Sequence, residues 1–152
     1  MALAYTLHIL FAVIWVGGMF FSQMALRPVV VAQLEAPQRL QLLTAVLGRF
    51  FWSVWAAVII LPVTGFWLIA SYGGMGNLGW HIHMMTALGM VMVLIYLVLY
   101  FVIFLRLRRA VTAQNFPAAG RQVVWVQRLV WTNLLLGVLI ILTTAFGARG
   151  GF

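Results

Sequence analysis

The three histidines of this chain, His8, His81 and His83, are the side chains whose type and position best suit chemistry. Each lies within or at the start of an apolar run, where an ionisable group that binds nothing is costly to keep. Imidazole is a common metal ligand, and methionine sulfur selects soft ions such as Cu(I). Met84 and Met85 follow His81 by three and four residues. We therefore expect a metal centre, for which the sequence offers two ligand sets.

The first ligand set is His8 with His83. His8 lies about five residues inside the first apolar run and His83 about four inside the third, so each imidazole is roughly 6–8 Å deep if both runs begin on one side of a membrane. Ala4, Ala12 and Ala87 stand one helical turn away and leave room for a flat macrocycle. This arrangement predicts haem b, with His8 and His83 as axial ligands of the iron.

The second ligand set is His81 with Met84 and Met85, which share one helix face and form a soft site for Cu(I). His81 and His83 are about 200° apart around a helix, so they cannot face the same centre. A third interpretation needs no metal, because a histidine in a membrane helix can hydrogen-bond a neighbouring helix. All three interpretations remain open at this point.

The composition identifies a membrane protein. Hydrophobic residues make up 66% of the 152 residues and charged residues 7%, with a mean hydropathy of +1.13. A soluble domain is nearer 45–50% apolar and about 25% charged. The length allows one domain, which we assign to residues 1–152. The chain has no cysteine, aspartate or lysine and a single acid, Glu35, which excludes thiolate sites, carboxylate dyads and Schiff bases.

Four apolar runs are long enough to cross a hydrocarbon core, which takes about 20 residues. We expect an all-α integral membrane four-helix bundle. We also expect Pro28 to end the first helix and Asn133 to need a partner on another helix. Gly17 and Gly18 should let a neighbouring helix approach closely. The expected helices lie near 3–23, 50–71, 79–104 and 124–146.

The arginines predict the orientation of the bundle. Eight of the nine lie in the first and third connectors or beside them, and Arg149 follows the fourth run. Positive charge concentrates on the inner side of a membrane, so both termini are expected on the outer, periplasmic side. The formal charge of +8 is then explained by anionic lipid head groups, and we expect no nucleic-acid partner.

The segment Leu7–Phe21, the pair Arg27-Pro28 and the segment Gly79–Met85 resemble the copper-resistance protein D (CopD) family of small four-helix membrane proteins. The resemblance spans essentially the whole chain. It implies copper uptake across the bacterial inner membrane by a multi-pass protein. The motif His-x6-Trp-x-Gly-Gly carries the likeness in the first helix, and it adds Trp15 to the candidate cofactor-binding residues.

The same segments are similar to HemJ-type protoporphyrinogen oxidases, which bind haem b. The functional histidine of their first helix matches His8. Their His-x-Lys near the start of the third helix matches His81 and His83, with histidine in place of lysine. This likeness implies a haem site, and the replacement argues against porphyrinogen oxidation while offering a second axial imidazole.

Our leading interpretation is an inner-membrane, cytochrome-b-like haem b protein. It would transfer electrons or oxidise a membrane-soluble substrate such as a quinol, a porphyrinogen or superoxide, as an oxidoreductase, with Arg149 pairing with a haem propionate. The alternatives are copper binding or uptake and a cofactor-free structural subunit. Expected partners are the lipid bilayer, a quinone or porphyrin substrate, and a second copy or another membrane subunit.

Overall fold

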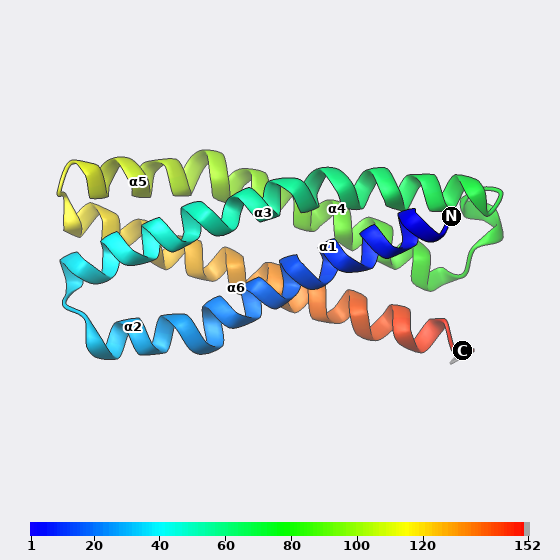
Figure 1. The fold of residues 1–152 in the computed structure, drawn as a ribbon, viewed down its shortest axis with the longest axis horizontal. Coiled ribbons are helices and arrows are strands. Elements are labelled where there is room, and N and C mark those ends of the chain that lie inside the picture. Colours follow the sequence, from blue (N-terminus) through cyan, green and yellow to red (C-terminus); the bar gives the residue numbers. More distant parts are fainter. Residues whose placement is uncertain (151–152) are drawn as a thin grey trace.

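The computed structural model describes residues 1–150, and all of its regular structure in that range is helical (Figure 1). The chain forms four long rods. The first consists of α1 (Ala2–Phe21), a π-helical segment (Ser22–Leu26) and α2 (Arg27–Gln33). The second is α3 (Ala36–Ser71). The third joins α4 (Trp80–Val98), a π-helical segment (Leu99–Phe104) and α5 (Leu105–Thr112), and the fourth is α6 (Phe116–Gly147).

The four rods alternate in direction and lie side by side in an elongated bundle (Figure 1). Each is long and apolar enough to cross a membrane, which confirms the all-α four-helix membrane fold. Both ends of the described chain lie at one end of the bundle, together with the connector 72–79. We call this the histidine end, because α1 and α4 begin there. The connectors 34–35 and 113–115 lie at the opposite, arginine end.

The rods are longer than the apolar runs that predicted them. They contain 32, 36, 33 and 32 residues, or about 48–54 Å of helix, against about 30 Å of hydrocarbon. The extra turns lie mostly at the arginine end. The prediction that Pro28 ends the first helix was wrong, because α2 continues through it to Gln33. The π-helical segment just before Pro28 already departs from regular α-helical hydrogen bonding, so the missing N–H and the bulky ring are accommodated.

Aromatic side chains fill the centre of the bundle and join α1, α3 and α4. Tyr96 of α4 is fully buried, and its hydroxyl donates to the Phe51 carbonyl of α3 at 3.1 Å. Its ring centroid lies 6.2, 5.6 and 5.4 Å from those of Trp15, Phe51 and Trp55, each in an edge-on arrangement. Such pairs add stability beyond the area they bury. This aromatic cluster fixes the three rods relative to one another.

Two further contacts position α6 and α1. The Asn133 side chain of α6 donates to the Met92 carbonyl of α4 at 3.1 Å, which confirms the expected interhelical partner. Gly18 of α1 has no Cβ where the Phe50 ring of α3 lies against it, so the close approach expected at this glycine is also confirmed. Gly17 faces open space.

Candidate functional site

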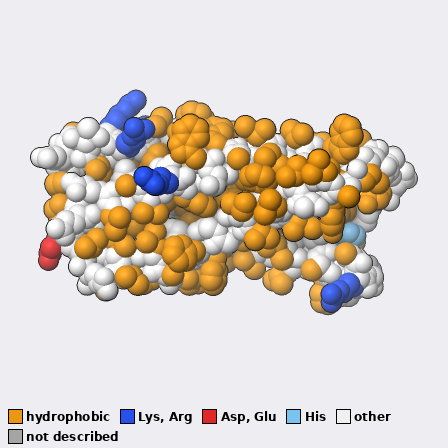
Figure 2. All heavy atoms as spheres, in the orientation of Figure 1, with side chains coloured by type: hydrophobic (Ala, Val, Ile, Leu, Met, Phe, Trp, Pro, Cys, Tyr) orange, Lys and Arg blue, Asp and Glu red, His pale blue; other side chains and the backbone are white. Residues whose placement is uncertain are grey.

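The three histidines all lie near the histidine end. His8 is in the second turn of α1, and His81 and His83 are in the first turn of α4. Figure 2 shows imidazole atoms at the surface of this end, in a molecule whose flank is otherwise largely apolar. The three side chains differ in what they contact, and these contacts decide what each can bind.

His8 is held by α3. Its Nδ1 lies 2.9 Å from the Thr64 hydroxyl oxygen, and that oxygen is 2.6 Å from the carbonyl oxygen of Ile60. A carbonyl only accepts, so the Thr64 hydroxyl proton points to Ile60, and toward His8 the oxygen must accept. His8 therefore carries its proton on Nδ1. Its Nε2 keeps a free lone pair, which is the form of imidazole that binds metal.

Gly65 makes the contact between His8 and α3 possible. A Cβ at this position would lie 3.2 Å from the His8 Cε1, so a side chain here would press on the ring. The sequence prediction did not include Thr64 or Gly65 among the site residues. The signal that could have found them is a hydroxyl followed by glycine within an otherwise apolar run.

His81 is held by α6 and by the start of its own helix. A Cβ on Gly147 would lie 2.5 Å from the His81 Cγ, and a Cβ on Gly79 would lie 2.7 Å from its Cε1. The Trp80 ring meets the imidazole edge-on, with centroids 6.2 Å apart. Two glycines thus define the place of the ring. Neither ring nitrogen makes a hydrogen bond to residues 1–150. The Nδ1 lies against both glycines, 2.6 and 2.9 Å from where their Cβ atoms would be, so the Nε2 is the nitrogen that is more open to a ligand.

The remaining candidates of α4 lie at different exposures. Met85 is partly buried, like His81, whereas Met84 is exposed at 37%. His83 is exposed and makes no hydrogen bond within the described chain. The side of α4 that carries His81 and Met85 therefore turns further into the bundle than the side that carries His83.

The two histidines of the predicted haem pair lie in different surroundings. His8 contacts α3, whereas His83 is exposed on a helix that packs mainly against α6. Among residues 1–150 no group of three or more His, Asp or Glu could hold a metal ion. Trp15 is buried in the aromatic cluster, and Arg149 is exposed just beyond α6. The haem and copper ligand sets both remain predictions.

Comparison with protein families gives a match to copper resistance protein D over residues 44–146, about two-thirds of the chain. The protein belongs to this family. Neither a comparison with curated proteins nor one with solved structures gives a match. The CopD likeness seen in the sequence is thereby confirmed, and the likeness to HemJ-type proteins stays a prediction.

The matched region begins within α3 and ends within α6. It contains His81, Met84 and Met85 at the start of α4, and also Thr64. His8 lies outside it. The protein is thus a multi-pass membrane protein of a copper-resistance family, and the candidate copper ligands lie in the part of the chain that shows the family.

Proposed function

We propose that this protein binds Cu(I) at the histidine end of its bundle and takes part in copper handling at the inner membrane. His81 and Met85 would be the main ligands, with Met84 beside them. The observation that carries the proposal is the family match over residues 44–146, which includes this whole helix face. Copper is the cargo here and not a fixed cofactor of an enzyme.

The chemistry of the face supports this assignment. Imidazole and thioether are the ligands that Cu(I) takes among the side chains present, since the chain has no cysteine. His81 and Met85 are spaced i, i+4, so they lie one above the other on α4. Both are partly buried, and the glycines beside the His81 ring hold it in place. A ligand that is already ordered loses less conformational entropy when it binds.

The arrangement of the deeper methionines supports ion binding more than ion conduction. Met92 is buried at 4% exposure, and the methyl group of its side chain lies 3.4 Å from where a Cβ on Gly137 would be. Met90 is 41% exposed on another side of the same helix. Met90 lies on the opposite face of α4 from His81. Met92 shares the face of His81 and Met85, but it lies seven residues, or about 10 Å, beyond Met85, so the sulfur atoms form no continuous path inward. We therefore propose capture of copper at one side of the membrane.

A competition titration tests the proposal. The detergent-purified protein is titrated without oxygen against a chromophoric Cu(I) chelator, beside the variants His81→Phe, Met85→Leu and Met90→Leu. We expect the first two to lose at least about tenfold in affinity, the lower bound for loss of a supporting group at a metal site. His81→Phe keeps a flat ring between the glycines, and Met90→Leu controls for loss of a sulfur from α4. Equal affinity in all four proteins would refute the site.

The haem b hypothesis can be tested on the same preparation. It has less support than copper binding, because the family match is to a copper-resistance family and His83 is exposed whereas His8 is bonded to α3. The free Nε2 of His8 is the feature that a haem ligand would need. Absorption spectra of oxidised and dithionite-reduced protein, made with ample haem, decide the matter. Reduced bands of b type that disappear in His8→Ala would restore the haem interpretation, with quinol or porphyrinogen turnover as the next assay.

A further inference from the structure

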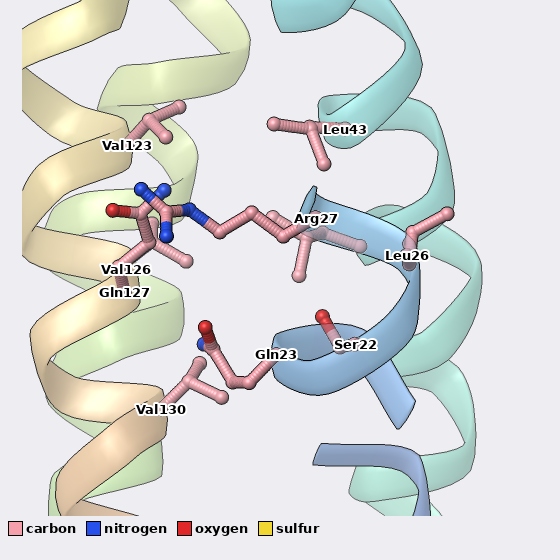
Figure 3. Close-up of a pocket in the computed structure, with 10 residues that line it drawn as sticks. Ser22, Gln23, Leu26, Arg27, Leu43, Val123, Val126, Gln127 and Val130 are labelled. Atoms are coloured by element: carbon pink, nitrogen blue, oxygen red, sulfur yellow. The ribbon is translucent and has the colours of Figure 1, made fainter. Parts of the chain in front are cut away.

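A small hollow, mainly apolar but with four polar residues in its lining, lies toward the arginine end, far from the histidines. It forms where the π-helical segment Ser22–Leu26 widens the first rod beside α3 and α6 (Figure 3). Its volume of about 20 Å³ is enough for one water-sized group. Its polar lining is Ser22, Gln23, Arg27 and Gln127, among leucine and valine side chains.

Two polar atoms in this hollow lack hydrogen-bond partners within residues 1–150. One is the Oε1 of Gln23, a residue only 6% exposed, and the other is the buried Nε of Arg27. Figure 3 shows the Arg27 side chain reaching across the hollow toward Gln127, with Gln23 extending into the same space. Buried polar groups are normally paired. An acceptor and a donor that are both unpaired in one hollow, and do not bond each other, indicate a group that both donates and accepts.

The charge of Arg27 also lacks compensation from the protein. A guanidinium stays ionised under all ordinary conditions. The single acidic residue of the chain, Glu35, is exposed beyond the end of α2, and the described residues form no ion pair. With a formal charge of +8 on the chain, any anion that pairs with Arg27 comes from outside it.

Exposed tryptophans and arginines near the hollow predict that it lies at the depth of lipid head groups. Trp52 of α3 and Trp125 of α6 are exposed at 78% and 51%, as in an aromatic belt at a membrane interface. Arg49 is exposed on α3, and Arg128 lies over the Trp125 ring at 5.1 Å. Gln127, which lines the hollow, directly precedes Arg128. The anions available at this level are lipid phosphates.

A second, apolar hollow adjoins the first. Its volume is about 110 Å³, and it shares Ser22, Leu26 and Leu47 with the first hollow. Its other lining residues are Gly18, Phe21, Val46 and Phe50. A hollow with a guanidinium and an amide in its lining, beside a more apolar hollow, matches a molecule with a charged head and a hydrocarbon tail.

We propose that these two hollows bind an anionic phospholipid with a hydroxylated head group, of the phosphatidylglycerol kind. Arg27 donates to the phosphate, and a head-group hydroxyl, which is about the size of a water molecule, enters the small hollow and donates to the Gln23 Oε1. Part of an acyl chain lies against Gly18 and Phe50. Choline and ethanolamine head groups fit poorly, because each brings a positive charge next to Arg27. This site is independent of the proposed copper site.

Lipid binding to the delipidated protein tests the proposal. Native mass spectrometry and thermal denaturation are used to compare phosphatidylglycerol, phosphatidylcholine and inorganic phosphate. We expect phosphatidylglycerol to bind about tenfold more tightly than phosphatidylcholine, because its hydroxyl can donate to Gln23 and because choline would bring a positive charge next to Arg27. Arg27→Gln should lose this preference. Arg49→Gln, which removes the same charge from an exposed site at the same level, should keep it.

A second variant tests the hydroxyl contact and does not depend on the folding of Arg27→Gln. Wild-type protein should prefer phosphatidylglycerol over phosphatidylmethanol, which has the same charge and no hydroxyl, and Gln23→Leu should not. Equal binding of these two lipids to both proteins would mean that water fills the hollow. Equal stabilisation by inorganic phosphate or by phosphatidylcholine would show an adventitious anion site or a non-specific lipid effect. Any of these results would overturn the proposal.

Discussion

The hydrogen bond between His8 and Thr64 sets the chemical form of the one imidazole that is bonded between helices. In Thr64→Val the shape is kept, but the His8 Nδ1–H loses its acceptor. We expect the ring to become a mixture of tautomers and the free energy of unfolding to fall by about 1 kcal/mol, since a partly buried donor is left unpaired. Nitrogen-15 NMR of the histidine side chains in lipid nanodiscs measures the tautomer.

The matched control for this change is Thr143→Val. The Thr143 hydroxyl donates to the Leu139 carbonyl of its own helix, so its loss should leave the spectrum of His8 unchanged. A wild-type His8 protonated on Nε2 would contradict the assignment, because its metal-binding nitrogen would then be the one that faces Thr64.

The contact between Gly147 and His81 is a second feature at the scale of single residues. In Gly147→Ala the new methyl group would overlap the imidazole, so the ring or the end of α6 must move. We expect a loss of about 1–3 kcal/mol in unfolding free energy, as for other overpacked sites, and weaker Cu(I) binding. Titration with a denaturing detergent and the copper competition assay measure the two effects.

Gly89→Ala is the control, because Gly89 lies within α4 and faces open space. An alanine inside a helix is favoured over glycine by roughly 0.5–1 kcal/mol, so this variant should be as stable as the wild type or more so. If Gly147→Ala behaves in the same way, the packing of His81 against α6 does not hold the ring.

Tyr96 links α4 to α1 and α3 through ring contacts and one hydrogen bond. In Tyr96→Phe the ring contacts remain, and the Phe51 carbonyl loses one donor, so we expect a cost of about 0.5–1.5 kcal/mol. In Tyr96→Ala a cavity forms between α1, α3 and α4, with an expected cost of about 3–5 kcal/mol. Unfolding in mixed micelles gives both values. Tyr72→Phe, at a residue 56% exposed, should cost almost nothing. Equal costs for Tyr96→Phe and Tyr96→Ala would show that the aromatic cluster does not join the rods.

The existence of four helices could be predicted from sequence, because an apolar run in a bilayer has few other ways to form hydrogen bonds with its backbone N–H and C=O groups. The residues at which the rods end could not be predicted in this way. Beyond the hydrocarbon the helices continue because they pack on each other, as the fully buried Leu107 and Ala119 show, and hydropathy does not report packing. Pro28 was misjudged because the preceding π-helical segment cannot be recognised from residue types.

For the candidate site, the sequence likewise predicts the location of the histidines but not the residues that contact them. Topology alone places His8, His81 and His83 near one end, and the structure agrees. Their partners Thr64 and Gly147 could not be found, because the rods are apolar on every side and no periodic pattern tells which face of a helix meets which neighbour. For the same reason, the common depth of His8 and His83 does not tell whether the two imidazoles face each other, and their pairing stays a prediction.

At the scale of the whole molecule, charge separates the two ends of the bundle. Eight arginines lie toward the arginine end or in its extra turns, and Arg149 alone lies near the opposite end. Positive segments are retained on the inner side of a bacterial membrane, so this asymmetry predicts that the arginine end is inside and the histidine end outside. The proposed copper site would then face the periplasm, where it could capture an ion before the membrane is crossed.

Cysteine labelling tests this orientation without background, because the chain has no cysteine of its own. Gly76→Cys lies in the connector at the histidine end, where added atoms meet open space, and Ala113→Cys lies in an exposed turn at the arginine end. In intact spheroplasts, a membrane-impermeant maleimide should label Gly76→Cys at once and Ala113→Cys only after lysis. The opposite order would place the histidines on the inner side. The copper site would then act in release or efflux, while the phospholipid site would move to the outer leaflet.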